Sequence, residues 1–446
     1  MRTATDTFGP YEKPKLNPIQ RAQNAYTADP RLTDPTLPPE ERKHGLAQGF
    51  LLNNKEQEAM TAPNGKLINQ TPGKLFQMGA VTEADMRLTQ QMAADPDEYR
   101  YLSPKDPTLI SSEELAKKII FGTEDPELLA RITTVPLTGM APSFSNIFQL
   151  LQKQHPDLNT VLLGTNAYGG YKSVLETAFE NVKKYRQGTE DNEFDMASFR
   201  ESIEALEDPE NTLLLLQSDA YNYTGVNPTS EQKQEIIEIL KEHGVITLVD
   251  SAYQGLTNGP EEDVEIARLL GKTDLPFIVY DSWSKKAGLY GKRIAFVHIA
   301  TGSEEQAATL RSNMYAQIRS NLLAVSPAFK VIHHLLTDEA LEHQWLKELE
   351  MASQILYVTK VKMAETLGEG FEYIHPDNTQ GMFNKFNISH EGGKVLADQY
   401  GIFVVNAEDE DTGKQSLRVN MGAIPEQDIE YIAASIKAVY AEHRTD

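Results

Sequence analysis

The chain has 446 residues, of which 40% are hydrophobic and 24% charged, a composition typical of a soluble globular protein with room for two or three domains. Asp and Glu number 65 against 42 Lys and Arg, and the net charge of -23 disfavours general binding to nucleic acids or anionic membranes, whose phosphates carry the same sign. The absence of cysteine excludes disulfides, thiolate metal sites and cysteine nucleophiles.

The N-terminal region, residues 1–75, is rich in proline, asparagine and charge and has only short apolar groups, such as 49–52. It predicts an extended arm that could pack on a partner subunit and supply part of a small domain. We expect neither a signal peptide nor a membrane helix, because no run of about 20 apolar residues occurs, and we expect a cytoplasmic protein.

From about residue 128 the pattern alternates between strands and helices, which predicts an α/β domain over 76–340 with a mostly parallel sheet flanked by helices. The run at 212–217 is apolar enough for a strand buried on both faces. Thr229 and Gln232 form a capping-box pattern, and Gly244 marks the end of that helix. The predicted strands are 131–137, 160–163, 212–217, 245–249, 277–280 and 294–299, and the predicted helices are 144–151, 173–182 and 229–244.

Beyond residue 340 the sequence predicts a smaller α+β domain over 341–446. A helical pattern covers 342–367, mixed strand signals follow through 404, and the chain finishes with an amphipathic helix. One apolar stripe of that last helix contains Ile429, Ile432, Ala433, Ile436 and Tyr440.

The most informative segment for chemistry runs from 281 to 293. Lys285 follows a buried strand and lies among small hydroxyl residues, where its amine can be desolvated and form an imine with a carbonyl. Ser282 and Arg293 are close enough in sequence to converge on a phosphate. Alone, the segment is equally typical of an exposed turn with two lysines.

Other polar residues follow predicted strands, and the carboxyl ends of parallel strands are where ligands bind in open α/β folds. Asp250 and Tyr253 end one strand, and a buried carboxylate there needs a cationic partner, although a simple turn cap is the plainer alternative. Asn222 follows a second strand in what could be an ordinary loop. Thr138-Gly139-Met140 precede a helix whose N-terminus could bind an anion, and Arg418 lies in an otherwise uncharged strand, where its partner could be a structural carboxylate.

Taken in order, these motifs resemble a known family. The patterns are Asn-x-Thr-Gly from 222, Asp-x-Ala-Tyr-Gln-Gly from 250, Ser-x-Ser-Lys-x-x-Gly-Leu-Tyr-x-x-Arg from 282 and Arg-x-Asn from 418. The chain from about 99 onward thereby resembles the class I aminotransferases that use pyridoxal 5'-phosphate (PLP), most nearly the aspartate aminotransferases. The resemblance implies fold type I, a homodimer with shared active sites, and amino-acid and 2-oxo-acid substrates.

The resemblance also implies a role for each matching residue. Lys285 would form the Schiff base and carry protons, Asp250 would pair with the pyridine nitrogen, and Tyr253 and Asn222 would bind the ring O3'. The remaining implied cofactor contacts are Thr138, Gly139, Met140, Tyr168, Ser282, Ser284, Arg293 and, from the partner subunit, Tyr101. The implied substrate contacts are Gly49, Asn222, Arg418 and, from the partner subunit, Arg319.

Three positions depart from the family pattern. Met140 stands where the family has a hydroxyl, Tyr223 replaces a proline and Tyr168 replaces a tryptophan. The predicted function is transfer of an amino group from aspartate or a related or aromatic amino acid to a 2-oxo acid such as 2-oxoglutarate. The alternatives are a PLP-dependent lyase or decarboxylase on the same fold, and a non-catalytic ligand-binding protein. We expect no metal site, because no HExxH or HxxEH pair occurs.

Overall fold

The computed structural model describes residues 68–69, 78–95, 103–123, 125–322 and 326–445. Apart from 68–69, the predicted N-terminal arm lies outside the described residues. Residues 68–398 and 402–446 form one compact unit, to which the fold and the site described below belong. The predicted domain boundaries near 76 and 340 stay a prediction.

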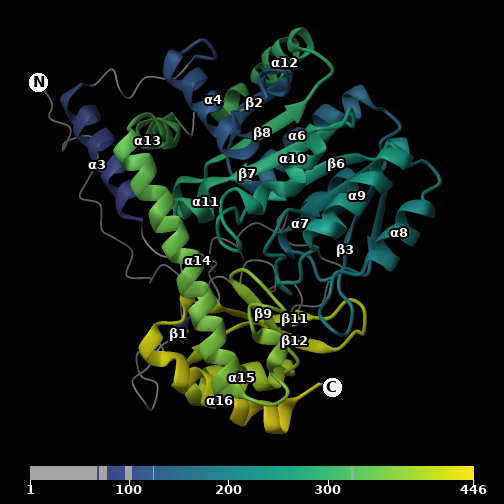
Figure 1. Ribbon diagram of the computed structural model, residues 1–446, viewed down its shortest axis with the longest axis vertical. Coiled ribbons are helices and arrows are strands. Elements are labelled where there is room, and N and C mark those ends of the chain that lie inside the picture. The colour runs from purple at the N-terminus through teal and green to yellow at the C-terminus, as the bar shows by residue number, and fades with distance from the viewer. Residues whose placement is uncertain (1–67, 70–77, 96–102, 124, 323–325, 446) are drawn as a thin grey trace, which may run out of the picture. The chain divides into compact units, whose positions relative to one another are not determined.

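A seven-stranded sheet forms the centre of this unit, in the order β2-β8-β7-β6-β5-β3-β4 (Figure 1). Its strands are β2 (Ile132–Leu137), β3 (Thr160–Gly164), β4 (Asn181–Tyr185), β5 (Thr212–Gln217), β6 (Ile246–Ser251), β7 (Phe277–Ser282) and β8 (Ala295–Ala300). Among these strands β8 runs opposite to the other six, which are parallel to one another. The predicted α/β fold with a mostly parallel sheet is therefore confirmed.

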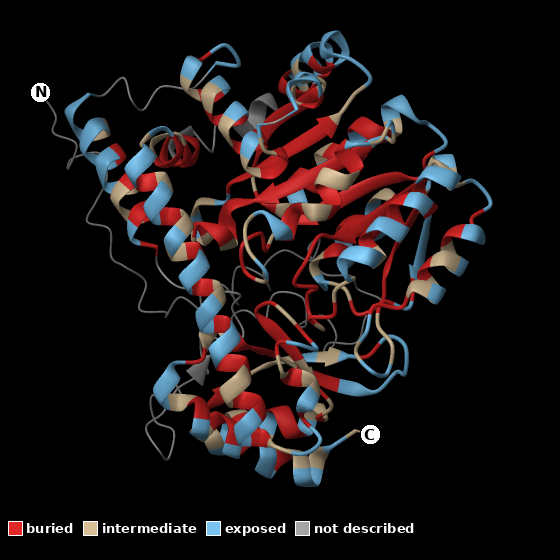
Figure 2. Cartoon of the chain, in the orientation of Figure 1, coloured by how far each residue is buried: buried red, intermediate tan, exposed pale blue. Residues whose placement is uncertain are grey.

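Two hydrophobic cores lie on opposite faces of this sheet, because successive side chains of a strand point to opposite sides. Leu213 and Leu215 of β5 belong to one core, and Leu214 and Leu216 belong to the other. Figure 2 shows the strands as a buried layer between the helices. Helices α6 (Met140–Gln154), α7 (Gly170–Ala178) and α12 (Glu304–Leu322) contribute to the first core, and α4 (Pro107–Phe121), α5 (Pro126–Ala130), α8 (Met196–Glu204), α9 (Ser230–His243) and α10 (Glu265–Gly271) to the second.

A smaller antiparallel sheet lies in the C-terminal part, in the order β11-β12-β9. Its strands are β9 (Phe383–Phe386), β11 (Val405–Glu408) and β12 (Gln415–Asn420), and a two-stranded parallel pair joins β1 (Ile68–Asn69) to β10 (Ile402–Phe403). The other helices are α3 (Gly79–Ala94), α13 (Ser326–Thr337), α14 (Glu339–Leu367), α15 (His390–Tyr400) and α16 (Ile429–His443). Figure 1 shows the long helix α14 running from α13 toward the helices beside the small sheet.

The local sequence signals are confirmed at α9, where Thr229 and Gln232 form the complete capping box and Gly244 takes a left-handed conformation with φ of 69°. The prediction of one element over 173–182 is wrong. The helix ends at Ala178, and β4 begins at Asn181. Four of the five β4 residues are exposed, so this edge strand lacks the apolar pattern by which the other strands were recognised. No helix in the described part of the chain is long and apolar enough to cross a membrane.

Candidate active site

A cavity of about 240 Å³ opens at the carboxyl ends of β5, β6 and β7 and is closed on one side by β9 and β12. Ten of the predicted site residues line it: Met140, Tyr168, Asn222, Asp250, Tyr253, Ser282, Ser284, Lys285, Arg293 and Arg418. Gly139 is held against Arg293 at its rim, whereas Thr138 does not line the cavity.

Asp250 is a buried carboxyl group at the end of β6. Its Oδ2 accepts a short hydrogen bond from the Tyr171 hydroxyl, and its Oδ1 has no hydrogen-bond partner among the described residues. Burial raises the pKa of Asp250 to about 6, although the Tyr171 hydrogen bond and the charge of Lys285 oppose that rise. An unpartnered buried oxygen of this kind is suited to a cationic N–H donor.

Lys285 lies on the single-turn helix α11 (Trp283–Lys286), which follows β7 directly. Its amine lies 4.7 Å from the centre of the Tyr290 ring. Burial, together with the positive charges of Arg418 and Arg293, lowers the pKa of Lys285 to about 8. About a tenth of this amine is therefore unprotonated at pH 7, far more than for an ordinary lysine, and can attack a carbonyl.

Arg293 and the start of α6 form a cradle for an anion. Gly139 is the N-cap of α6 and has a φ of 63°. A Cβ at Gly139 would lie 2.3 Å from a terminal nitrogen of Arg293, so the guanidinium is pressed against the backbone at the helix N-terminus. The Ser282 hydroxyl accepts a 3.3 Å hydrogen bond from the backbone N–H of Ser284. A guanidinium and a helix N-terminus together attract a phosphate group.

Asn222 connects the large sheet to the small one. Its amide nitrogen donates to the Tyr253 hydroxyl at 2.9 Å, and its oxygen accepts from the Arg418 guanidinium at 3.3 Å. The Arg418 guanidinium lies 4.4 Å from the centre of the Phe383 ring, and burial lowers the pKa of Arg418. The peptide bond between Asn222 and Tyr223 is cis. These contacts hold the Arg418 guanidinium, which extends from β12, at the wall of the cavity.

Sequence reasoning missed two of the polar residues that line the cavity. Tyr171 contacts Asp250 and packs edge-to-face on Tyr168, with 5.5 Å between ring centres. Gln217 accepts a 3.0 Å hydrogen bond from the Asn222 backbone N–H. The available signals were a second tyrosine three residues after Tyr168, in the first turn of α7, and the one polar residue at the end of the apolar β5 run.

Three predicted contacts cannot be placed in the cavity. Gly49 and Tyr101 lie outside the described residues. Arg319 lies in α12, but its side chain is not among those described.

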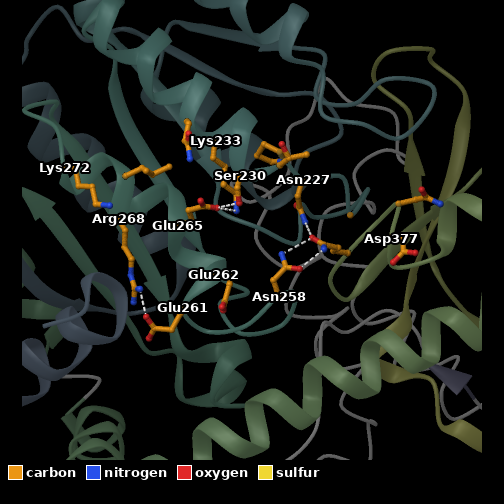
Figure 3. Close-up of a pocket in the computed structure, with 17 residues that line it drawn as sticks. Asn227, Ser230, Lys233, Asn258, Glu261, Glu262, Glu265, Arg268, Lys272 and Asp377 are labelled. Atoms are coloured by element: carbon orange, nitrogen blue, oxygen red, sulfur yellow. Dashed lines mark hydrogen bonds and ion pairs between the residues drawn. The ribbon is translucent and has the colours of Figure 1, made fainter. Parts of the chain in front are cut away.

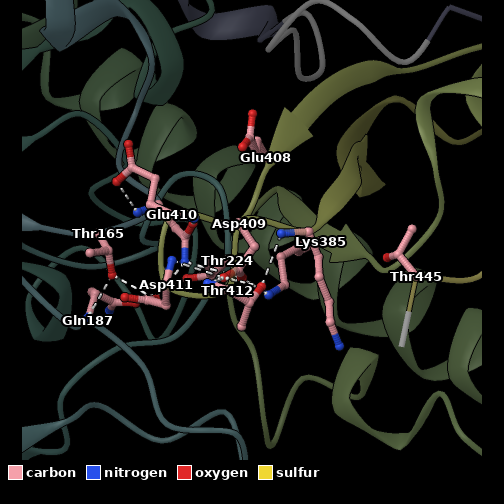
Figure 4. A network of polar contacts seen from close by, with 12 residues as sticks. Thr165, Gln187, Thr224, Lys385, Glu408, Asp409, Glu410, Asp411, Thr412 and Thr445 are labelled. Carbon is pink, nitrogen blue, oxygen red and sulfur yellow. Dashed lines mark hydrogen bonds and ion pairs between the residues drawn. The ribbon is translucent and has the colours of Figure 1, made fainter.

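The turn between β11 and β12, residues 409–414, forms a hairpin tip that contacts the end of β3 (Figure 4). The Thr165 hydroxyl donates to Asp411 at 2.9 Å, and the Asn166 backbone N–H donates to Glu410 at 2.9 Å. Lys184 pairs with Glu410 at 2.6 Å. A second cavity of about 620 Å³ lies beside this contact and shares Tyr168, Asn222 and Arg418 with the first. The hairpin tip thus ties the strand that carries Arg418 to the large sheet.

A larger cavity of about 660 Å³ lies at α9 and α10, away from these residues (Figure 3). Two of its cations are neutralised by neighbours, because Lys233 pairs with Asp219 and Glu265, and Arg268 pairs with Glu261. Among the described residues that line it, no carboxyl group has a buried oxygen without a hydrogen-bond partner, as Asp250 has.

Comparison with known proteins connects this geometry to one family. A family model described as "Aminotransferase class I and II" matches residues 69–436. The aspartate aminotransferase of Pseudomonas aeruginosa is 28% identical over 330 residues, which cover 72% of this chain and 80% of the relative. The aromatic-amino-acid aminotransferase of Escherichia coli is 28% identical over 342 residues, covering 75% and 83%.

Solved structures show the same fold. An aromatic amino acid aminotransferase from Burkholderia cenocepacia superposes with a TM-score of 0.76 at 22% identity, covering 89% of this chain and 96% of that one. The corresponding enzyme from Burkholderia pseudomallei, covalently bound to pyridoxal phosphate, gives a TM-score of 0.76 at 21% identity, covering 87% and 96%.

Proposed function

The chain belongs to the class I and II aminotransferases, which are PLP-dependent enzymes, and from this membership we propose that its donor is aspartate or an aromatic amino acid and its acceptor a 2-oxo acid such as 2-oxoglutarate. The observation that carries the proposal is that the Lys285 amine, of lowered pKa, and the buried Asp250 carboxyl line one cavity. The named activities of the relatives support both candidate donors.

The residues of the cavity fit PLP in three respects. The unpartnered Oδ1 of Asp250 suits a protonated pyridine nitrogen, which is a cationic N–H donor. The cradle of Arg293 and the α6 N-terminus suits the phosphate, with Ser282 and Ser284 beside it. The Lys285 amine suits the aldehyde. When bound, PLP supplies an electron sink that makes the substrate Cα–H bond acidic.

The protein's own groups perform the remaining tasks. Lys285 Nζ accepts the proton that leaves the substrate Cα, and its lowered pKa keeps the amine available as a base near neutral pH. Arg418 binds the substrate α-carboxylate with two parallel hydrogen bonds, which orients the Cα–H bond toward Lys285. Asn222 and Tyr253 hold one another at 2.9 Å, and their amide and phenol would be available to bind O3'. Tyr168, which also lines the cavity, would pack against the ring.

The assembly we propose is a homodimer in the cytoplasm, with a large domain over 76–340 and a small domain over 341–446. The resemblance of the sequence motifs supports this arrangement. In it the partner subunit supplies Tyr101 to the phosphate and Arg319 to the substrate side chain, and Gly49 contacts the substrate. An Arg319 guanidinium would favour a dicarboxylate donor over an aromatic one.

The test is product analysis of the PLP-loaded protein with L-aspartate or L-phenylalanine, each with and without 2-oxoglutarate. Transamination predicts equal amounts of glutamate and the donor's 2-oxo acid, and sustained turnover only when the acceptor is present. Release of carbon dioxide or ammonia without an acceptor would contradict the proposed transamination in favour of a decarboxylase or lyase. Protein that neither takes up PLP nor turns over substrate would be a binding protein.

A further inference from the structure

Two adjacent lysines of α11 point in opposite directions. Lys285 lines the cavity, whereas the Lys286 side chain is fully buried in the core. The Lys286 amine forms a short ion pair with Asp281 and donates to the Gln254 amide oxygen at 2.8 Å. A lysine is rarely buried unless it is paired, so this placement must be compensated by specific partners.

Lys286 and its two partners each lie next in sequence to a group of the active site. Gln254 directly follows Tyr253 beyond β6, Asp281 directly precedes Ser282 at the end of β7, and Lys286 itself directly follows Lys285. One buried ammonium group therefore joins the three backbone segments that carry the phenol, the hydroxyl and the amine of the cavity.

Further contacts fix this junction within the core. The Trp283 indole N–H donates to Asp281 at 2.8 Å, and the Trp345 indole N–H donates to the Lys286 carbonyl at 2.8 Å. The two indole rings stack with 5.2 Å between their centres and 22° between their planes. The Gln254 amide nitrogen donates to the carbonyls of Ile119 and Pro260. The short α11 turn is thus held on both sides.

The buried charges of Lys286 and Asp281 balance one another. Burial alone would raise the pKa of Asp281, but the Lys286 ammonium holds it below its usual range. Burial lowers the pKa of His298, so its ring is neutral and adds no second cation. Removing either charge of the pair leaves the other buried without compensation.

We propose that Lys286 is a positioning residue that acts through Asp281 and Gln254 to fix the direction of the Lys285 amine relative to Ser282 and Tyr253. The inference rests on the proposed role of Lys285. Lys286 itself touches neither substrate nor cofactor. Loss of its contacts lets the α11 turn rotate, so the Lys285 amine spends less time where it can react.

The test compares Lys286→Met and the double variant Asp281→Asn/Lys286→Met with a control, Lys347→Met. Lys347 is an exposed lysine of α14. The measurements for each variant are the rate of PLP uptake by the apo-protein, the pH midpoint of the visible absorption change of the loaded protein, and the kcat and KM of transamination. Circular dichroism and thermal unfolding report on the fold separately. Gln254→Met removes the neutral partner of Lys286 and the donations to the Ile119 and Pro260 carbonyls but leaves the ion pair in place, so it provides a milder variant.

We expect Lys286→Met to take up PLP about tenfold more slowly and to lower kcat more than it changes KM, because positioning of a reacting group is lost. The double variant should remain slow although its buried charges are removed together, and Gln254→Met should shift the same quantities to a smaller extent. Recovery in the double variant would overturn the proposal in favour of a simple charge effect.

The proposal would also be overturned if Lys286→Met lowered the melting temperature but had the same PLP uptake rate and pH midpoint as Lys347→Met. That result would describe a lysine with a purely structural role. If neither Lys286 variant folds, Gln254→Met decides between these outcomes. The proposed function is tested separately by the wild-type protein. Wild type without a PLP absorption band would overturn the role of Lys285 and the inference with it.

Discussion

The carboxyl edge of the large sheet and the β11–β12 hairpin supply the two halves of the cavity in different ways. At the sheet edge, Asp250 lies near the end of β6 and Lys285 follows β7, and both strands are buried along their whole length. On the hairpin, Arg418 is held in place partly by a tip whose Glu410 pairs with Lys184 of β4, and both side chains remain well exposed. The groups proposed for bond making are therefore fixed by core packing, and the group proposed for substrate binding is fixed in part by solvent-accessible contacts.

This difference predicts that substitutions at the sheet edge affect cofactor binding and chemical steps, and that substitutions on the hairpin affect substrate binding. Buried contacts are insensitive to salt, whereas exposed ion pairs are screened within about 8 Å at physiological ionic strength. The following predictions test that division, from the largest expected effect to the smallest.

Arg418→Met should lower kcat/KM about a hundredfold, mostly through KM, because the substrate carboxylate loses a bidentate partner. Steady-state kinetics with each donor checks this, and the variant should still bind one PLP per chain, although loss of the Arg418 charge raises the pKa of Lys285. Loss of PLP binding would mean that Arg418 belongs to the cofactor half, and the division would fail.

Tyr171→Phe should weaken PLP binding at pH 7 about tenfold, because Asp250 loses a hydrogen bond to its charged form. That loss raises the pKa of Asp250 further above its value of about 6, so more of the carboxyl is protonated at pH 7. Equilibrium titration with PLP should show the defect shrinking as the pH rises to 8. A defect that is independent of pH would contradict this explanation.

The rate of PLP uptake by the apo-protein should rise roughly fivefold between pH 7 and pH 8 and level off above about pH 9. The reason is that only the unprotonated Lys285 amine reacts, and its pKa is lowered to about 8. Stopped-flow absorbance measures this directly. Continued tenfold increases per unit up to pH 10 would indicate an amine with an ordinary lysine pKa.

Glu410→Gln should change kcat by less than about twofold and raise KM only a few-fold, because an exposed ion pair contributes about 1 kcal/mol or less. Adding salt to wild type should reproduce most of the effect on KM. A large fall in kcat would show that the hairpin tip takes part in the chemical step.

The sequence predicted the buried strands and most of the cavity because both leave short-range signals. The predicted strands 212–217 and 245–249 are predominantly apolar, and Asp250 directly follows the second. β4 was missed because an exposed edge strand carries polar residues. The ion pair of Asp281 and Lys286 was also missed. Next to Lys285, the sequence gives Lys286 the pattern of an exposed turn. Its burial becomes evident only when distant partners, such as Gln254, are known.

The most direct measurement for the central claim is to locate the attachment site of PLP. The protein is incubated with PLP, the adduct is reduced with borohydride, and the labelled peptide is identified by mass spectrometry in wild type and in Lys285→Ala. We predict one label per chain in wild type, on Lys285 and not on the adjacent Lys286, and no label at this turn in Lys285→Ala. A label on Lys286, or equal labelling of both proteins, would contradict the assignment of Lys285 as the reactive amine.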